Sequence, residues 1–168
     1  TKLIQFCLTT SCIDVIGCVT GSKTKTYPTS DGEICARQYC VENEMPIISI
    51  EDIFQFPDLD LIISARNDTI LSEEILKYPR LGVLNCHGGL LPNYKGVGGH
   101  IFPIINNEKY TGATIHWMTS EIDAGNIVDQ EIISITADIN GLGLFTAIND
   151  ALYNLIKVNL LKILAMKI

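Results

Sequence analysis

Apolar residues along this chain gather either in short continuous runs or at helical spacings of three and four. The continuous runs, which predict strands, occupy residues 13–20, 46–50, 60–65 and 82–87, and residues 111–118 and 127–135 alternate as strands do. The helical spacings occupy residues 1–8, 32–44, 71–77, 101–107 and 142–168. Strands that alternate with helices are typical of an α/β domain, so we predict a doubly wound, mostly parallel sheet.

Proline and charge refine this pattern at three places, at Pro28, Glu51-Asp52 and Pro103. The polar segment 21–31 contains Pro28 and is predicted to be a loop. The acidic pair Glu51-Asp52 is expected to open a small helix, and Pro103 to lie in the first turn of its helix. Residues 142–168 predict one or two closing helices.

The start of the chain departs from the usual order of a doubly wound domain. Residues 1–8 predict a helix, although such a domain normally begins with a strand and a turn. The pattern therefore indicates that the first strand is missing, through truncation or an unusual start. A length of 168 residues suits one domain with a proper core, so residues 1–168 are predicted to form a single domain.

Composition narrows the class of protein. With 47% hydrophobic and 18% charged residues, the chain is expected to fold as a globular domain. The net charge of −7 argues against a domain that grips a nucleic acid backbone, but it leaves room for a small anionic ligand. The sequence contains neither a signal-peptide pattern nor an apolar run near the roughly 20 residues that cross a bilayer. We expect a cytoplasmic protein that does not enter a membrane.

The cysteines and histidines do not predict a metal site. None of the six cysteines forms a CxxC pair, and the three histidines have no metal-ligand spacing to them. We interpret the thiols as buried or incidental groups in a reducing compartment.

The candidate chemistry begins where residues 82–87 end. Asn85 and His87 are two residues apart, so both side chains project from one face of that strand, near the edge of a parallel sheet where ligands bind. Gly88-Gly89 allows a sharp turn. A later strand leads to Asp123-Ala124-Gly125, a tight turn that can bring the carboxylate close to His87.

These three residue types suit acyl transfer to an amine. The amide of Asn85 is a donor that never titrates, and an imidazole at His87 can donate to the oxyanion or relay a proton. Asp123 can orient that imidazole and help to deprotonate the amine through a water. On spacing alone, however, Asn-x-His at a strand end is more often a polar loop anchor. We interpret His116 as a structural histidine and His100 as a surface residue within reach of a substrate.

At these residues the chain resembles the formyltransferase family that uses 10-formyltetrahydrofolate. The matching segments, in family order, are Asn85-Cys-His87, Leu90-Leu-Pro92, Tyr94-Lys-Gly96, Gly112-Ala-Thr-Ile-His116 and Asp123-Ala-Gly125. The resemblance is strongest over residues 58–135. It implies a Rossmann-like formyltransferase domain in which Asn85, His87 and Asp123 are catalytic.

The resemblance also implies a cofactor site, with 10-formyltetrahydrofolate as the formyl donor. The pterin would contact backbone groups of two segments, Thr69-Ile70-Leu71 and Ser120-Glu121-Ile122. This sequence departs from the family at Gly88-Gly89, where many members have Pro-Ser. It also lacks the first strand and its phosphate-binding turn, and no C-terminal appendage follows within these residues.

These departures bear on the acceptor, which we expect to be a small-molecule primary amine. The acidic charge and the absent appendage argue against methionyl-tRNA, and the absent turn argues against glycinamide ribonucleotide. An amino sugar carried on a nucleotide is the favoured acceptor, and the sequence is compatible with a homodimer. A hydrolase that releases formate and a non-catalytic folate-binding domain stay open. Convergence of Asn85, His87 and Asp123 would distinguish an enzyme from a binder.

Overall fold

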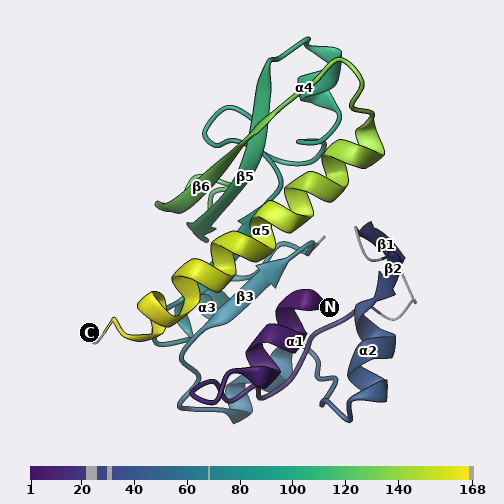
Figure 1. The fold of residues 1–168 in the computed structure, drawn as a ribbon. Coiled ribbons are helices and arrows are strands. Elements are labelled where there is room, and N and C mark those ends of the chain that lie inside the picture. Colours follow the sequence, from purple (N-terminus) through teal and green to yellow (C-terminus); the bar gives the residue numbers. More distant parts are fainter. Residues whose placement is uncertain (22–25, 30–31, 68, 167–168) are drawn as a thin grey trace. The chain divides into compact units, whose positions relative to one another are not determined.

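The computed structural model describes residues 1–21, 26–29, 32–67 and 69–166. The chain divides into two compact units, Thr1–Pro57 and Asp58–Ile168. We call these the N-terminal unit and the C-terminal unit and describe each by itself (Figure 1). The first element is helix α1, Lys2–Thr9, where the sequence predicted a helix over residues 1–8.

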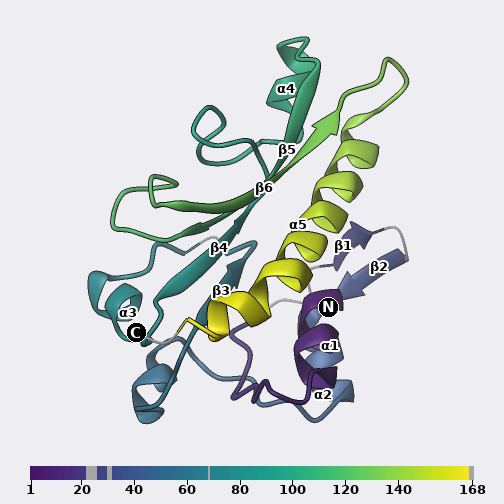
Figure 2. The same ribbon diagram turned by 60° about the vertical axis from the view of Figure 1, so that its left-hand side comes forward.

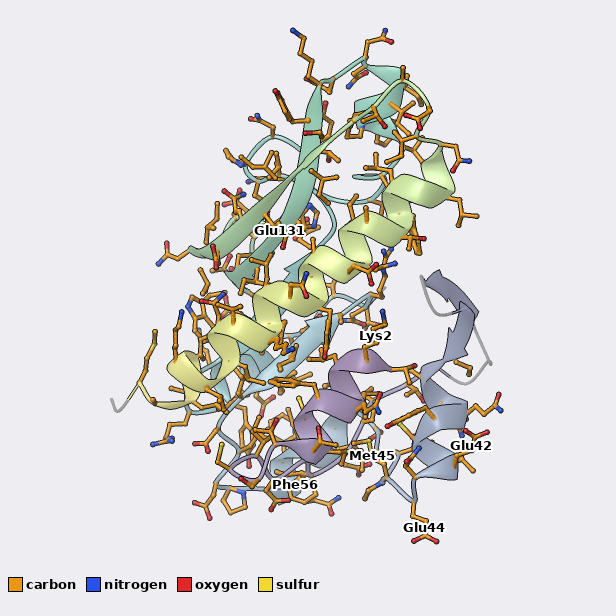
Figure 3. The ribbon with its side chains drawn as sticks, in the orientation of Figure 1. Lys2, Glu42, Glu44, Met45, Phe56 and Glu131 are labelled. Atoms are coloured by element: carbon orange, nitrogen blue, oxygen red, sulfur yellow. The ribbon has the colours of Figure 1, made fainter. Side chains whose placement is uncertain are left out.

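The N-terminal unit is built from short elements. After α1 come strands β1, Thr26–Thr29, and β2, Gly32–Cys35, which pair antiparallel. Helix α2, Ala36–Glu42, follows, and the predicted small helix at Glu51 is the 3-10 helix η1, Glu51–Gln55. Beyond α2, Glu44 (labelled in Figure 3) adopts a φ of 52°, the left-handed conformation often found after a helix C-terminus.

Several predictions in the N-terminal unit were wrong. Residues 13–20 and 46–50 are not strands: only Cys18 and Ile47 form a parallel bridge. An apolar run becomes a strand only when its backbone groups form a series of hydrogen bonds with a neighbouring segment. Between these two segments, all of whose residues are described, the structure has only two such bonds, from Cys18 N to Pro46 O and from Ile48 N to Cys18 O. The segment 21–31, predicted to be a loop, contains strand β1. Residues 22–25 and 30–31 of this segment lie outside the described residues.

The helix predicted over 32–44 begins later than expected. Its first four residues pair with β1 as strand β2, and α2 starts at Ala36. Cys35 is the N-cap, because its sulfur accepts a hydrogen bond from Gln38 N at 3.5 Å. The helical spacing of apolar residues does not reveal this cap, since cysteine is not among the usual capping residues.

The C-terminal unit follows the predicted order closely. Its strands and helices, in chain order, are β3 Ile62–Ala65, α3 Glu73–Lys77, β4 Val83–His87, α4 Phe102–Ile105, β5 Tyr110–Trp117, β6 Ile127–Ser134 and α5 Gly141–Leu164. Pro103 lies in the first turn of α4, as predicted. Residues 142–164 belong to one closing helix, which begins at Asn140, whose side chain accepts from Gly143 N at 2.8 Å.

The sheet of the C-terminal unit is mixed and has the order β3-β4-β5-β6. The predicted parallel pairing joins β3 to β4, whereas β4 and β5, and then β5 and β6, pair antiparallel. Antiparallel strands at the end of a parallel α/β sheet are common. The fold is α/β, as predicted, and the antiparallel extension places β5 beside β4 and β6 beside β5.

The core of this unit lies between β5 and α5. Residues 111–116 of β5 are all buried, and α5 packs against β5 and β6, beside which it lies in Figures 1 and 2. Leu144, Ile148 and Ile156 on α5 are almost completely buried, and burying such a side chain stabilises a fold by about 1.5–3 kcal/mol. This packing fixes β5, whose polar residues Thr114 and His116 are therefore held inside the fold. Among the described residues, no helix combines the length and apolarity needed to span a membrane.

Candidate active site

Four polar side chains of the C-terminal unit meet near the end of β4. Asn85 and His87 lie two residues apart on β4, as the sequence predicted. On the antiparallel neighbour β5, His116 lies opposite Asn85 in the pairing register. Asp123 comes from the connection between β5 and β6. Two strands and one connection thus supply an amide, two imidazoles and a carboxylate.

Two of the predicted catalytic residues, Asn85 and His87, each lie within contact distance of the third, Asp123. His87 Nδ1 lies 3.3 Å from Asp123 Oδ2, and Asn85 Nδ2 donates to Asp123 Oδ1 at 3.4 Å. The side chains of His87 and Asp123 are only 7% and 10% exposed, so water weakens their interaction little. The carboxylate therefore accepts a hydrogen bond from the amide of Asn85 and lies close to the imidazole of His87.

His116 belongs to this cluster, although we interpreted it from the sequence as a separate structural histidine. Its Nε2 lies 3.1 Å from Asn85 Nδ2 and 3.4 Å from Asp123 Oδ1. Its Nδ1 lies 3.0 Å from the carbonyl oxygen of Trp117, which can only accept, so Nδ1 carries the hydrogen. The other ring nitrogen then accepts from Asn85, and the two amide hydrogens of Asn85 go to His116 and Asp123.

The backbone around Asp123 explains the Asp-Ala-Gly sequence. Asp123 has a φ of 48°, in the left-handed region that residues with a Cβ rarely adopt. Two positions on, a Cβ at Gly125 would overlap the carbonyl of Trp117, so only glycine fits there. Asp123 Oδ2 also accepts from Gly96 N at 2.7 Å. Such strained backbone clusters at functional sites, where surrounding contacts hold it.

The loop that follows β4 closes on His87. His87 Nε2 lies 2.6 Å from the carbonyl oxygen of Tyr94, so Nε2 carries a hydrogen in this arrangement. A Cβ at Gly89 would come within 3.0 Å of both His87 Nε2 and Tyr94 O. Gly89, where the sequence departs from the family pattern, therefore leaves space for the contact between His87 Nε2 and Tyr94 O.

An open depression reaches the carboxylate from outside. It has a volume of about 300 Å³ and is lined by Leu91, Pro92 and Lys95 of the loop and by residues 123–127. Lys95 Nζ lies 3.4 Å from Glu121 Oε1 at the protein surface. The buried cluster is thus accessible at Asp123, where a small polar reactant can approach.

The two predicted pterin-binding segments lie in connections of the same unit. Thr69, Ile70 and Leu71 lie between β3 and α3, where Asn67 bonds to both the N–H and the carbonyl of Thr69, at 3.1 and 2.7 Å. Ser120, Glu121 and Ile122 directly precede Asp123 in the connection from β5 to β6. Ile70 and Ile122 are 79% and 59% exposed, so both present apolar surface that a flat ring could cover.

Two further groups near the cluster are not part of it. The ring of His100 packs edge-on against the ring of Phe145 on α5, with 5.1 Å between the ring centroids. Burial lowers the pKa of His100, and the positive charge of Arg66 makes a smaller contribution in the same direction. Cys86 lies between Asn85 and His87 in sequence, and burial raises the pKa of its thiol to about 12. Across the residues that the structure describes, no group of three His, Cys, Asp or Glu is placed to hold a metal ion.

The sequence of the chain matches one family, and the matched segment includes this site. Residues 48–155, more than half of the chain, match the formyl transferase family model, and the chain belongs to that family. The chain is 50% identical over 76 residues to the bifunctional polymyxin resistance protein ArnA of Wigglesworthia glossinidia brevipalpis. It is 41% identical over 91 residues to methionyl-tRNA formyltransferase of Staphylococcus aureus strain JH1. These matches cover 45% and 54% of this chain, and 12% and 29% of those relatives.

Solved structures show the same fold over nearly the whole chain. One is the N-formyltransferase of Helicobacter canadensis in complex with folinic acid and dTDP-3-aminofucose, with a TM-score of 0.75 and 26% identity. Another is the sugar 3N-formyltransferase WlaRD with dTDP and 5-N-formyl-tetrahydrofolate, with a TM-score of 0.81 and 26% identity. Each match covers 96% of this chain, but only 59% and 58% of the other. Phosphoribosylglycinamide formyltransferase of Bacillus halodurans has a TM-score of 0.69 and 25% identity, covering 77% of this chain and 74% of that one.

Proposed function

We propose that this chain carries the catalytic site of an N-formyltransferase that moves a formyl group from 10-formyltetrahydrofolate to a primary amine. The observation that carries the proposal is that Asn85 and His87 converge on Asp123, whose carboxylate lies 3.4 Å from the amide nitrogen and 3.3 Å from the imidazole. A folate-binding domain without catalysis needs no such convergence. Membership of the formyl transferase family and relatives solved with folinic acid and 5-N-formyl-tetrahydrofolate support the donor.

In this proposal each residue has one task. The amine nitrogen forms a bond to the formyl carbon, the bond from that carbon to the folate nitrogen breaks, and the amine proton passes to that nitrogen. Asn85 and His87 donate hydrogens to the carbonyl oxygen while it carries negative charge. In the structure these hydrogens are given to His116, Asp123 and Tyr94 O, so the bound carbonyl replaces one of those acceptors.

Asp123 has the second task, which concerns protons. Its carboxylate orients the imidazole of His87 and takes the amine proton, directly or through a water, on the side that faces the depression. Proton transfer by a positioned side chain typically contributes about 10²–10⁴-fold to a rate. Pterin binding is assigned to Thr69-Ile70-Leu71 and Ser120-Glu121-Ile122, where the exposed side chains of Ile70 and Ile122 suit a flat ring.

The acceptor we propose is an amino sugar carried on a nucleotide. Two sugar N-formyltransferases, both crystallised with thymidine nucleotides, align with 96% of the chain. The phosphoribosylglycinamide enzyme aligns with 77%. Methionyl-tRNA formyltransferase is the alternative on sequence identity, although a net charge of −7 is unfavourable for binding tRNA.

The proposal assigns residues 1–168 to one catalytic domain, with the four clustered side chains in its C-terminal unit. It includes a cytoplasmic location, which suits six free cysteines. The homodimer that the sequence allows stays a prediction.

The proposal is tested by following tetrahydrofolate formation from 10-formyltetrahydrofolate by absorbance. The purified protein is assayed in four separate conditions: without any amine, with glycinamide ribonucleotide, with initiator methionyl-tRNA, and with a panel of nucleotide-linked amino sugars. Turnover with an amino sugar alone is the expected result. Turnover without an amine would instead identify a hydrolase, and folded protein that binds folate without any turnover would identify a binding domain.

A further inference from the structure

A second polar network joins β5 and β6 to the loop that follows His87. Thr114 Oγ1 on β5 lies 2.7 Å from Gly89 O, 3.3 Å from Leu91 N and 2.9 Å from Gln130 Nε2 on β6. Gln130 Nε2 also donates to Leu91 O at 3.0 Å. Neither Thr114 nor Gln130 has a task in the chemistry proposed above.

The hydrogens in this network have one consistent arrangement. The single hydroxyl proton of Thr114 must go to Gly89 O, because a carbonyl can only accept. Thr114 Oγ1 therefore accepts from Leu91 N and from the amide of Gln130. The second amide hydrogen of Gln130 goes to Leu91 O, so its nitrogen, and not its oxygen, must face the loop. Thr114 is completely buried, so water cannot replace these bonds.

The network lies in line with the catalytic imidazole. In the sheet register His87 pairs with Thr114, and Thr114 pairs with Gln130. Paired residues project from the same side of a sheet, so the three side chains form a row across β4, β5 and β6. In Figure 3 the labelled Glu131 marks the position on β6 that directly follows Gln130.

The row fixes the same loop that touches His87. Gly89 and Leu91, which the network holds, lie between His87 and Tyr94 in the chain, and Tyr94 O accepts from His87 Nε2. We propose that Gln130 is a positioning residue: through Thr114 and Leu91 it sets the loop so that His87 keeps its Nε2 hydrogen bonded and its Nδ1 facing Asp123. This inference rests on the proposed function.

The alternative is that Gln130 only stabilises the fold, and kinetics separates the two. Gln130→Ala removes both hydrogen bonds, Gln130→Glu keeps the shape but has no N–H donor, and Thr114→Val removes the hydroxyl from a β-branched side chain. Thr114→Ser keeps the hydroxyl and serves as the conservative rescue. The matched control is Asn159→Ala, which removes an amide bond of 2.8 Å to Asp129 on β6 without touching the loop.

We expect kcat to fall about 10- to 100-fold in Gln130→Ala, Gln130→Glu and Thr114→Val, because misplacement by about 1 Å can reduce a rate about 10²-fold. The KM for folate should stay within about twofold, Thr114→Ser should keep most of the activity, and Asn159→Ala should lower Tm without lowering kcat. The inference is overturned if kcat stays within twofold of wild type in all three variants, or falls equally in Asn159→Ala. If Gln130→Ala does not fold, Gln130→Glu and Thr114→Val decide.

A second measurement does not depend on turnover. Nitrogen-15 NMR of the histidine side chains reports which ring nitrogen of His87 carries the hydrogen and whether that hydrogen is protected from exchange. We expect a protected Nε2 hydrogen in wild type and Asn159→Ala, and its loss in Gln130→Ala. An unchanged His87 signal in Gln130→Ala contradicts the positioning role even if no amine accepts a formyl group. A changed signal in an inactive wild-type protein leaves the positioning role standing while the proposed function fails.

Discussion

Asn85 and His116 face each other across β4 and β5, with the amide nitrogen of Asn85 3.1 Å from Nε2 of the imidazole. Because Nδ1 of His116 donates to Trp117 O, Nε2 is the acceptor in this pair. The second hydrogen of the same amide goes to Asp123 Oδ1. The orientation of Asn85, on which its proposed contact with the formyl oxygen depends, is thus set by a buried histidine.

This relationship predicts that His116 is needed for the reaction rate. His116→Phe removes the acceptor for Asn85 and keeps a ring in the buried space. We expect kcat to fall about 10- to 100-fold, because the side-chain amide of Asn85 stays at the same position but is no longer held in one orientation. The folate Kd should stay nearly constant. Steady-state kinetics and a folate-binding titration would measure this. A variant as fast as wild type would show that His116 is structural only.

His87 is predicted to act in chemistry and not in folate binding. His87→Ala removes the imidazole that lies 3.3 Å from Asp123, and we expect formyl transfer to fall by at least about 10²-fold. Folate binding should remain, because the pterin is assigned to residues 69–71 and 120–122 and not to the side chain of His87. His100→Ala is the control, since His100 packs on Phe145 and not in the cluster. Full activity in His87→Ala would remove His87 from the mechanism.

Much of the C-terminal unit was predictable because its strands are apolar or alternating runs that each pair with a neighbouring strand of the sheet. Asn85 and His87 could be found from their spacing of two on such a run, and Asp123 from the tight Asp-Ala-Gly turn. His116 could not be placed in the site from the sequence, because its position depends on the antiparallel register of β4 and β5. In the N-terminal unit, the described residues 13–20 form a single β-bridge, between Cys18 and Ile47, and no ladder of backbone hydrogen bonds. The spacing of apolar residues in the sequence does not reveal this lack of a pairing partner.

Gly89 provides a test of the loop geometry. A Cβ there would come within 3.0 Å of His87 Nε2 and Tyr94 O, so Gly89→Ala should weaken their hydrogen bond and displace the loop. We expect kcat to fall about tenfold or more. Gly141→Ala is the matched control, because a Cβ at this helical position meets nothing within 4 Å and should leave activity unchanged. Equal activity in both variants would mean that the loop absorbs the methyl group without moving His87.

Cys86 is predicted to be inert although it lies between two proposed catalytic residues in the chain. Burial raises the pKa of its thiol to about 12, so at pH 8 almost none is thiolate, the form that reacts with iodoacetamide. Cys12 is exposed and should be alkylated first in the native protein. Peptide mass spectrometry after timed labelling would give both rates. Alkylation of Cys86 as fast as Cys12 would contradict the burial of β4.

The most direct test of the central claim follows the formyl carbon itself. Wild-type protein and an Asp123→Asn variant are incubated with 10-formyltetrahydrofolate labelled in its formyl group and with nucleotide-linked amino sugars, and the sugar products are analysed by mass spectrometry. We predict a labelled N-formyl sugar with wild type and at least about a 10²-fold slower appearance with Asp123→Asn. If folded wild-type protein that binds the folate yields no labelled product with any amine, or if Asp123→Asn is as fast as wild type, the Asn85–His87–Asp123 site does not perform formyl transfer.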